Sequence, residues 1–365
     1  MWLSEYYRVS LLRHLPALVA FPVLVLAACH GKATPKTQGG KAPAAKPLDG
    51  LDLPGPLHSL LTTGKWDGTP RDFRIVTLSF LADSCLAQAQ EDPGLANAAR
   101  ACVRICAKLA HGTRPAATKG PRHGLWLSHY NLILGAADRL GPCLDATIHR
   151  ELATALAQGS LRDPHFHMPS FPDLPFRWPA DQTATLAGLH RYDRAHHESL
   201  AVQPTLKWIA FMKEKGMDTA LGLPVSEVTG KAKHAREPRG CALSWQTRYL
   251  REFAPDLATA WWRNYRKHFL WDRLLVVGFR EWPPGREHPA DMDSGPIVHG
   301  IGTAASALAI GAARSIGETI LAARLEAAAS AATQLAGPAA RRAAQTQLAS
   351  AILALGAHVP DPGPR

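Results

Sequence analysis

The chain has 365 residues, of which 46% are hydrophobic and 19% are charged, and its formal net charge is +11. This composition excludes a disordered or collagen-like chain, and the length allows a large buried core or roughly two ordinary domains. A strongly basic chain ordinarily suggests nucleic acid as a partner. We expect no nucleic-acid partner here, because the first thirty residues indicate a different environment.

Residues 1–28 have the pattern of a bacterial signal peptide. Arg8 and Arg13 precede Leu15–Ala28, a run of fourteen residues that contains only apolar residues and prolines. A membrane-spanning helix needs about 20 residues, whereas a run of this length suits the apolar part of a signal peptide. The run ends at Leu26-Ala27-Ala28-Cys29, which resembles the lipobox of bacterial lipoproteins.

The lipobox resemblance implies that Cys29 carries palmitate or similar acyl chains and becomes the first residue of the mature protein. Several acyl chains would anchor the protein permanently to membrane lipid. His30, rather than an aspartate, follows the cysteine, which is compatible with sorting to the outer membrane, facing the periplasm or the cell surface. The alternative is an ordinary signal peptide followed by a chance cysteine.

Residues 29–52 are rich in Lys, Pro, Gly, Ala and Thr and are predicted to form a disordered tether. Signal peptide and tether together carry three net positive charges, which leaves +8 on the 313 residues of the predicted domain, 53–365. This excess is spread along the chain. It fits a soluble basic surface, or a surface facing anionic lipid or an acidic glycan.

Besides Cys29, the chain contains Cys85, Cys102, Cys106, Cys143 and Cys241. Export permits disulfides, but an odd number of cysteines cannot all pair within one chain. Cys102 and Cys106 share the apolar face of one predicted helix and are expected to be small core residues, although a bridge from Cys85 to this helix stays open. Cys241 starts a predicted helix, where the thiol pKa is expected to fall.

Apolar residues at three- and four-residue spacing dominate the chain from residue 56 onward. Ala242, Trp245, Tyr249 and Phe253 illustrate the pattern, and the best short strand-like run is 274–277. The domain is therefore predicted to be all-α. The predicted helices span residues 70–89, 93–111, 123–140, 143–159, 179–198, 201–215, 239–253, 256–272, 294–314, 317–334 and 338–356.

Every second predicted helix starts near residue 70, 123, 179, 239 or 294, which gives a structural repeat of about 55 residues. Repeating helical hairpins bury one face against their neighbours, either in an open solenoid or in a closed ring. The small residues of 302–311 suit an inner helix that is packed on every side, and long loops recur at the same end of each pair. Both features favour an (α/α) toroid of about six hairpins.

Three segments carry a family resemblance: Trp178-Pro179-Ala180-Asp181-Gln182, Pro238-Arg239-Gly240 and Asp291-Met292-Asp293-Ser294-Gly295-Pro296. Together with the small-residue helix that follows, they resemble bacterial six-hairpin toroid proteins, in particular the linalool dehydratase/isomerase-like group. The resemblance covers roughly residues 120–320. It implies a helical ring and an exported location, and it does not assign catalytic residues one by one.

Two aspartates are the candidate catalytic residues. Asp181 lies in the first predicted turn after Pro179, and Asp293 is expected to cap the helix that begins near Pro296. If both helices belong to the inner ring, their carboxylates converge, and such a pair can act as general acid and base. Either aspartate could instead serve only to cap its helix.

The residues around these aspartates are candidates for substrate binding: Trp178, Arg239, Cys241, Glu281, Trp282 and Asp291, with Phe166, Phe171 and Phe176 nearby. Aromatic rings beside carboxylates suit a sugar or an isoprenoid, although the same rings could simply fill the mouth of the ring. Asp291 and Asp293 could also ligate a cation, but the spacing of a calcium loop is missing.

No cofactor or metal is expected from the remaining motifs. The chain has 17 histidines, including His165-Phe166-His167 and His196-His197, but no third ligand follows at a telling spacing. Residues 300–305 fit a loose GxGxxA pattern without a preceding strand, which argues against dinucleotide binding. The sequence contains neither a GxSxG motif nor a phosphate-binding loop.

The sequence thus predicts a lipid-anchored envelope protein. Its toroid would act as a hydrolase, lyase or isomerase on a glycan or a small alcohol or isoprenoid, with Asp181 and Asp293 at the centre. The alternative is a noncatalytic envelope protein that uses the same domain for binding or as a scaffold.

Overall fold

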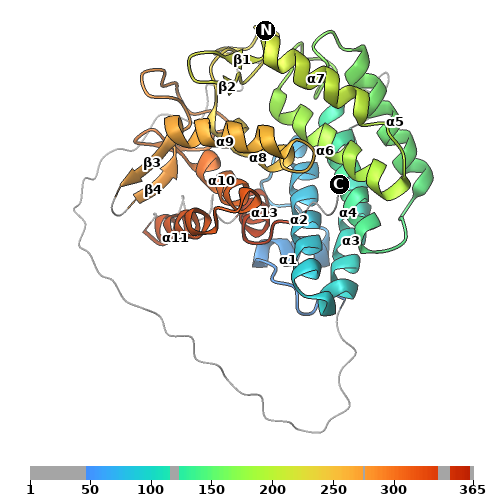
Figure 1. Cartoon of the computed structure of the whole chain (residues 1–365). Helices are drawn as coiled ribbons and strands as arrows, with labels where there is room; N and C mark the ends of the chain where they lie inside the picture. Colours follow the sequence, from blue (N-terminus) through green and yellow to red (C-terminus); the bar gives the residue numbers. More distant parts are fainter. Residues whose placement is uncertain (1–46, 116–122, 274–275, 336–345, 362–365) are drawn as a thin grey trace, which may run out of the picture. The chain divides into compact units, whose positions relative to one another are not determined.

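The computed structural model describes residues 47–115, 123–273, 276–335 and 346–361. The predicted signal peptide, Cys29 and most of the predicted tether lie outside these residues. The described part is mainly helical, which confirms the all-α prediction (Figure 1). Within it, no helix is both long enough and apolar enough to cross a membrane.

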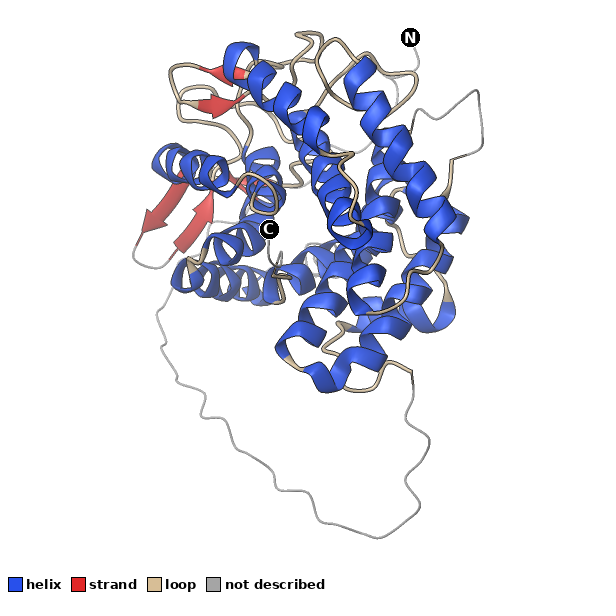
Figure 2. Cartoon of the chain, turned by 45° about the vertical axis from the view of Figure 1, so that its right-hand side comes forward, coloured by secondary structure: helices blue, strands red, loops and turns tan. Residues whose placement is uncertain are grey.

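Three pairs of short strands accompany the helices (Figure 2). The helices are α1 (Gly55–Thr63), α2 (Arg71–Glu91), α3 (Ala96–Thr113), α4 (Gly124–Leu140), α5 (Ala146–Arg162), α6 (Pro179–His196), α7 (Val202–Lys215), α8 (Gly240–Leu250), α9 (Pro255–Phe269), α10 (Thr303–Ile316), α11 (Thr319–Leu335) and α13 (Gln347–Ala357), with a 3-10 turn at Pro93–Leu95. The antiparallel strand pairs are β1 (Met217–Asp218) with β2 (Leu223–Pro224), β3 (Leu270–Arg273) with β4 (Val276–Phe279), and β5 (Ile297–Val298) with β6 (Ile301–Gly302).

Most predicted helices agree with the structure to within a few residues, but two predicted boundaries are wrong. In addition, the helix predicted over 338–356 is not continuous, because α13 begins at Gln347 after the capping Thr346, and residues 338–345 lie outside the described residues. The helix predicted over 256–272 ends at Phe269, because residues 270–273 form strand β3. The helix predicted to begin at residue 294 begins at Thr303. Residues 297–302 form the β5–β6 hairpin instead of the start of this helix. At its turn, His299 and Gly300 both have positive φ, the backbone conformation that a two-residue hairpin turn requires.

One set of helices packs in sequence: α2 contacts α4, α4 contacts α6, α6 contacts α8, α8 contacts α10, and α10 contacts α13, which also contacts α2. These helices are buried on several sides; in α2, every residue from Ile75 to Ala89 is buried. A second set covers them, with α3 on α2, α5 on α4, α9 on α8 and α11 on α10. The pairs α2–α3, α4–α5, α8–α9 and α10–α11 agree with the predicted helical hairpins, whereas the main helix contact of α7, which was predicted to pair with α6, is with α5.

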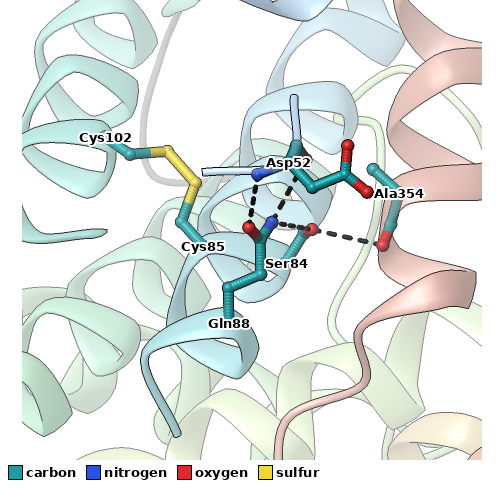
Figure 3. Close-up of a disulfide and its surroundings, with 6 residues drawn as sticks. All are labelled: Asp52, Ser84, Cys85, Gln88, Cys102 and Ala354. Carbon is teal, nitrogen blue, oxygen red and sulfur yellow. Dashed lines mark hydrogen bonds between the residues drawn. A yellow bond between two sulfur atoms is a disulfide. The ribbon is translucent and has the colours of Figure 1, made fainter. Parts of the chain in front are cut away.

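A disulfide joins Cys85 on α2 to Cys102 on α3 (Figure 3). The bridge that the sequence left open is therefore present, and the expectation that Cys102 is an unpaired core residue is wrong. Cys106 is a buried free thiol, and Cys143 and Cys241 are free as well. A crosslink that closes a loop of 17 residues stabilises a fold by about 3 kcal/mol through the entropy of the unfolded chain.

Next to this disulfide, α2 binds segments from both ends of the described chain (Figure 3). The amide of Asp52 donates to Oε1 of Gln88 at 2.7 Å, and Nε2 of Gln88 donates back to the Asp52 carbonyl at 3.2 Å. The hydroxyl of Ser84 donates to the carbonyl of Ala354 on α13 at 3.2 Å. These bonds hold the segment that precedes α1 and the last described helix, α13, on the same helix.

A buried ion-pair network connects α2, α6 and α8. Arg191 on α6 donates to Oδ1 of Asp83 at 2.6 Å and to Oε1 of Glu252 at 2.5 Å. Arg248 on α8 also donates to Asp83. The four side chains are 7% exposed or less. Each charged group in the network contacts a group of opposite charge. These attractions offset much of the free-energy cost of removing the four charges from water.

Candidate functional site

Asp181 lies in the first turn of α6, two residues after Pro179, as the sequence predicts. Its Oδ2 accepts a hydrogen bond from the hydroxyl of Ser170 at 2.5 Å. Ser170 is itself held at the start of α4, because its carbonyl accepts from the amide of Leu125 at 3.2 Å. The aspartate therefore sits between the N-terminal ends of two neighbouring helices.

Burial, with a smaller contribution from the negative charge of Asp293, raises the pKa of Asp181 to about 6, although the hydrogen bond from Ser170 lowers it. A carboxyl group with this pKa is partly protonated near neutral pH. It can therefore donate a proton as a general acid.

Asp293 does not cap a helix, and that expectation is wrong. It lies in the loop before β5, where Asp291 rather than Asp293 organises the backbone. Oδ1 of Asp291 accepts from the amides of Asp293 and Ser294, both at 3.0 Å. The Asp293 side chain is left 59% exposed, yet desolvation by the surrounding protein raises its pKa despite the nearby Arg239. It is thus a carboxylate within reach of solvent that still has protein closely around it.

Arg239, the residue before α8, connects the acidic residues of this region. Its guanidinium donates to Oε1 of Glu281 at 2.7 Å and to Asp291, and it lies 3.7 Å from Oδ2 of Asp293. Burial would raise the pKa of Asp291, but the charge and hydrogen bond of Arg239 lower it. Asp291 therefore stays ionised, and Arg239 holds the loop that carries Asp293.

Gly240 explains how α8 brings Arg239 to this position. Its amide donates to the carbonyl of Glu281 at 2.8 Å, and a Cβ at Gly240 would lie only 2.1 Å from the carbonyl oxygen of Arg280. Only glycine permits so close an approach of two backbones. The Pro238-Arg239-Gly240 segment thus seats the start of α8 against residues 280–281.

Cys241 is buried beside Glu281, and the expected lowering of its thiol pKa is wrong. Burial and the charge of Glu281 raise the pKa well above its usual value, which outweighs the favourable charge of Arg239. The thiol therefore stays protonated and is a poor nucleophile. Glu281 is itself fully buried, and its Oε2 has no hydrogen-bond partner among the described residues.

The aromatic candidates divide into separate groups. Trp178, at the start of α6, packs against Phe171 and Phe176, with ring centroids 6.0 and 5.5 Å apart. Trp282 lies under the guanidinium of Arg239 at 5.2 Å. Phe166 packs instead against Phe211 on α7, in a hydrophobic cluster of its own. Phe166 thus serves the core in this structure.

The sequence did not identify Ser170, although it holds the carboxyl group of Asp181. No local pattern distinguishes this serine from others in the loop, because its role depends on the contact between two helix ends. It also did not foresee that Arg239 would bind the loop of Asp291 and Asp293. With its guanidinium against both aspartates, this pair is poorly suited to hold a cation.

A cavity of about 410 Å³ lies elsewhere, at the C-terminal ends of several helices. Its lining includes Glu91 of α2, Arg248 of α8, Arg314 of α10 and Ala357 of α13. The carboxylate cluster, in contrast, forms near the N-terminal ends of α6 and α8. No protein-family model matches the chain, and no curated protein is significantly similar to it.

Proposed function

We propose that this chain is a lipid-anchored bacterial envelope protein whose helical domain is an (α/α) toroid with an acid–base site. The site would act on a glycan or on a small alcohol or isoprenoid, as a hydrolase, lyase or isomerase. The resemblance to the linalool dehydratase/isomerase-like group favours the second kind of substrate. Asp181 would be the general acid and Asp293 the base.

The toroid is supported by the succession of helix contacts. Helices α2, α4, α6, α8, α10 and α13 contact one another in order, and the last contacts the first. An open solenoid would not bring its terminal helices together. The hydrogen bond from Ser84 on α2 to Ala354 on α13 occurs at the contact that would close the ring.

The enzymatic proposal is supported by the raised pKa of Asp181, which arises mainly from burial and to which the charge of Asp293, from a separate segment of the chain, also contributes. Asp181 is poised to hold a proton, while Asp293 is accessible to a substrate. Its raised pKa also makes Asp293 a stronger base than an ordinary aspartate. Arg239, Trp178 and Trp282 would orient the substrate around the pair.

A turnover screen tests this proposal. The purified full chain is incubated with peptidoglycan fragments, neutral oligosaccharides and short isoprenoid alcohols, and products are identified by mass spectrometry. We expect conversion of one class by the wild-type chain and none by the double variant Asp181→Asn, Asp293→Asn. Binding without conversion by the wild-type chain would contradict the enzymatic proposal and favour the alternative.

The alternative is a noncatalytic binding or scaffold protein, and two observations favour it. Arg239 binds the loop of Asp291 and Asp293, which reduces the freedom of Asp293 to act as a base. The cavity of about 410 Å³ lies at other helix ends, away from the carboxylates. In that case the protein would bind its ligand in the cavity without chemistry.

The envelope location is supported by the Cys85–Cys102 disulfide, because such bridges form and persist in oxidising compartments.

We expect Cys29→Ser to release the protein from the membrane, since the acylated cysteine is the proposed anchor. Fractionation of cells that produce the variant checks this, with Cys106→Ala as a control that leaves Cys29 intact. A variant that stays in the membrane fraction would contradict lipidation at Cys29.

A further inference from the structure

Four side chains with metal-binding atoms meet where α4, α5 and α6 approach one another. They are Asp138 near the end of α4, Cys143 in the following loop, His149 in the first turns of α5 and His196 at the end of α6. One ligand atom from each lies within 4.8 Å of all the others. The residues come from three helices and a loop, so the cluster depends on the fold.

The Asp138 carboxylate is the centre of this cluster. Its Oδ2 lies 2.9 Å from Nδ1 of His149 and 2.9 Å from Nε2 of His196. The thiol of Cys143 also hydrogen-bonds to this carboxylate. The four groups therefore already face one common point.

His149 is the clearest sign that the cluster is incomplete as an ordinary hydrogen-bond network. Its side chain is fully buried, with Nδ1 2.9 Å from Oδ2 of Asp138, whereas Nε2 makes no hydrogen bond among the described residues. Oδ1 of Asp138 also lacks a partner there. Buried polar atoms are costly when unpaired, so Oδ1 of Asp138 is a position in the cluster where a further ligand can bind.

We propose that Asp138, Cys143, His149 and His196 bind Zn²⁺ in a four-coordinate site. Zn²⁺ prefers thiolate, imidazole and carboxylate ligands in a tetrahedron, with bonds of about 2.0–2.3 Å that separate the ligand atoms by about 3.3–3.8 Å. The four ligand atoms lie within 4.8 Å of one another, and the two distances of 2.9 Å from Asp138 to the histidines would have to lengthen to this range around a bound ion. A site in which the protein supplies all the ligands leaves no position for a substrate, which makes this a structural site.

Local packing supports this assignment. Tyr192 on α6 stacks on His196 with ring centroids 4.5 Å apart, and it meets the edge of His149 at 4.9 Å. It therefore fixes the orientation of both imidazoles, as the surroundings of a metal site must.

The metal would fasten the α4–α5 hairpin to the C-terminal end of α6. In an oxidising envelope it would also protect Cys143, a free thiol that is only partly buried. This inference concerns different residues from the carboxylate cluster. A turnover screen without conversion would therefore not contradict the metal site, and the absence of bound metal would not contradict the proposed function.

The test uses the purified full chain, stripped with a chelator and titrated with Zn²⁺ or Co²⁺. We expect about one metal ion per chain by elemental analysis, a higher Tm on adding Zn²⁺, and slower alkylation of Cys143. With Co²⁺, a thiolate-to-metal charge-transfer band should appear. The absence of both metal binding and a change in Tm would overturn the proposal. A Co²⁺ spectrum without the thiolate band would also overturn it.

Variants then assign the ligands. Cys143→Ser and His196→Asn should each weaken Zn²⁺ binding by more than about 100-fold, because loss of a supporting residue already costs 10- to 100-fold. Cys106→Ala and His197→Asn are the matched controls and should bind as wild type. Circular dichroism verifies that each variant is folded. Wild-type affinity in both ligand variants would overturn the assignment.

Discussion

Replacing Arg191 by methionine is expected to destabilise the folded protein by about 3–5 kcal/mol. Arg191 is almost completely buried and donates to both Asp83 and Glu252. Methionine fills similar space but leaves Glu252 buried without its main partner. The remaining partner, Arg194, lies 3.5 Å from the Glu252 carboxylate, farther away than Arg191. Chemical denaturation at neutral pH measures the loss.

The pH dependence of this loss identifies its cause. Burial would raise the pKa of Glu252 in the wild type, but the charge of Arg191 lowers it. The ion pair therefore contributes stability above the unfolded pKa, and this contribution is lost as the pH falls through the folded pKa. Without Arg191, burial dominates and raises the folded pKa, so the variant is penalised most at neutral pH.

The deficit of the variant should therefore shrink from pH 7 to pH 5. Arg150→Met is the matched control, because Arg150 pairs with Glu198 at the surface with 67% of its side chain exposed. Exposed pairs contribute about 0–1 kcal/mol. If Arg191→Met costs no more than this control, the buried network is not a major source of stability.

Asp181→Asn is expected to lower kcat by about 10²–10⁴-fold on the substrate that the turnover screen identifies, because asparagine cannot donate the proton. The pKa of Asp181 is raised to about 6 by burial and by Asp293. The wild-type rate should therefore fall as the pH rises through about 6. Steady-state kinetics across this pH range measures both effects, with the exposed Asp173→Asn as control.

The same variant has a consequence for stability that needs no substrate. A folded pKa above the unfolded value contributes stability that is present at low pH and is lost as the pH rises through about 6. Above about pH 6 the buried carboxyl group must ionise, which costs stability in the wild type. Asp181→Asn removes this cost, while the side-chain oxygen of the asparagine can still accept the hydrogen bond from Ser170. We expect a variant more stable than wild type at pH 8 and not at pH 4. Equal stability at both values would contradict the raised pKa.

The sequence predicted the helical class and most helix positions because these depend on local patterns. Helix α4 was predicted over 123–140 and spans Gly124–Leu140. The helix prediction was wrong at Ile297–Gly302, where small and apolar residues had suggested a helix. There, hydrogen bonding of the β5–β6 hairpin next to Arg280 prevails over local helix preference.

The candidate site was predictable only in part. Pro179 placed Asp181 in a first helical turn, which is a local effect. The loop position of Asp293 and the raised thiol pKa of Cys241 arise from neighbours that are distant in sequence, Arg239 and Glu281 among them. The cluster of Asp138, Cys143, His149 and His196 has no sequence signature, because its ligands span 59 residues without a regular spacing.

Length, composition and a charge of +11 had suggested a basic protein of about two domains. The sequence by itself determined the helical class and most helix positions, because these depend on nearby residues; the signal peptide stays a prediction. Only the tertiary structure decided which charges are paired, which cysteines are joined and which titratable groups meet. Burial and charge act through space, and the fold alone sets those distances.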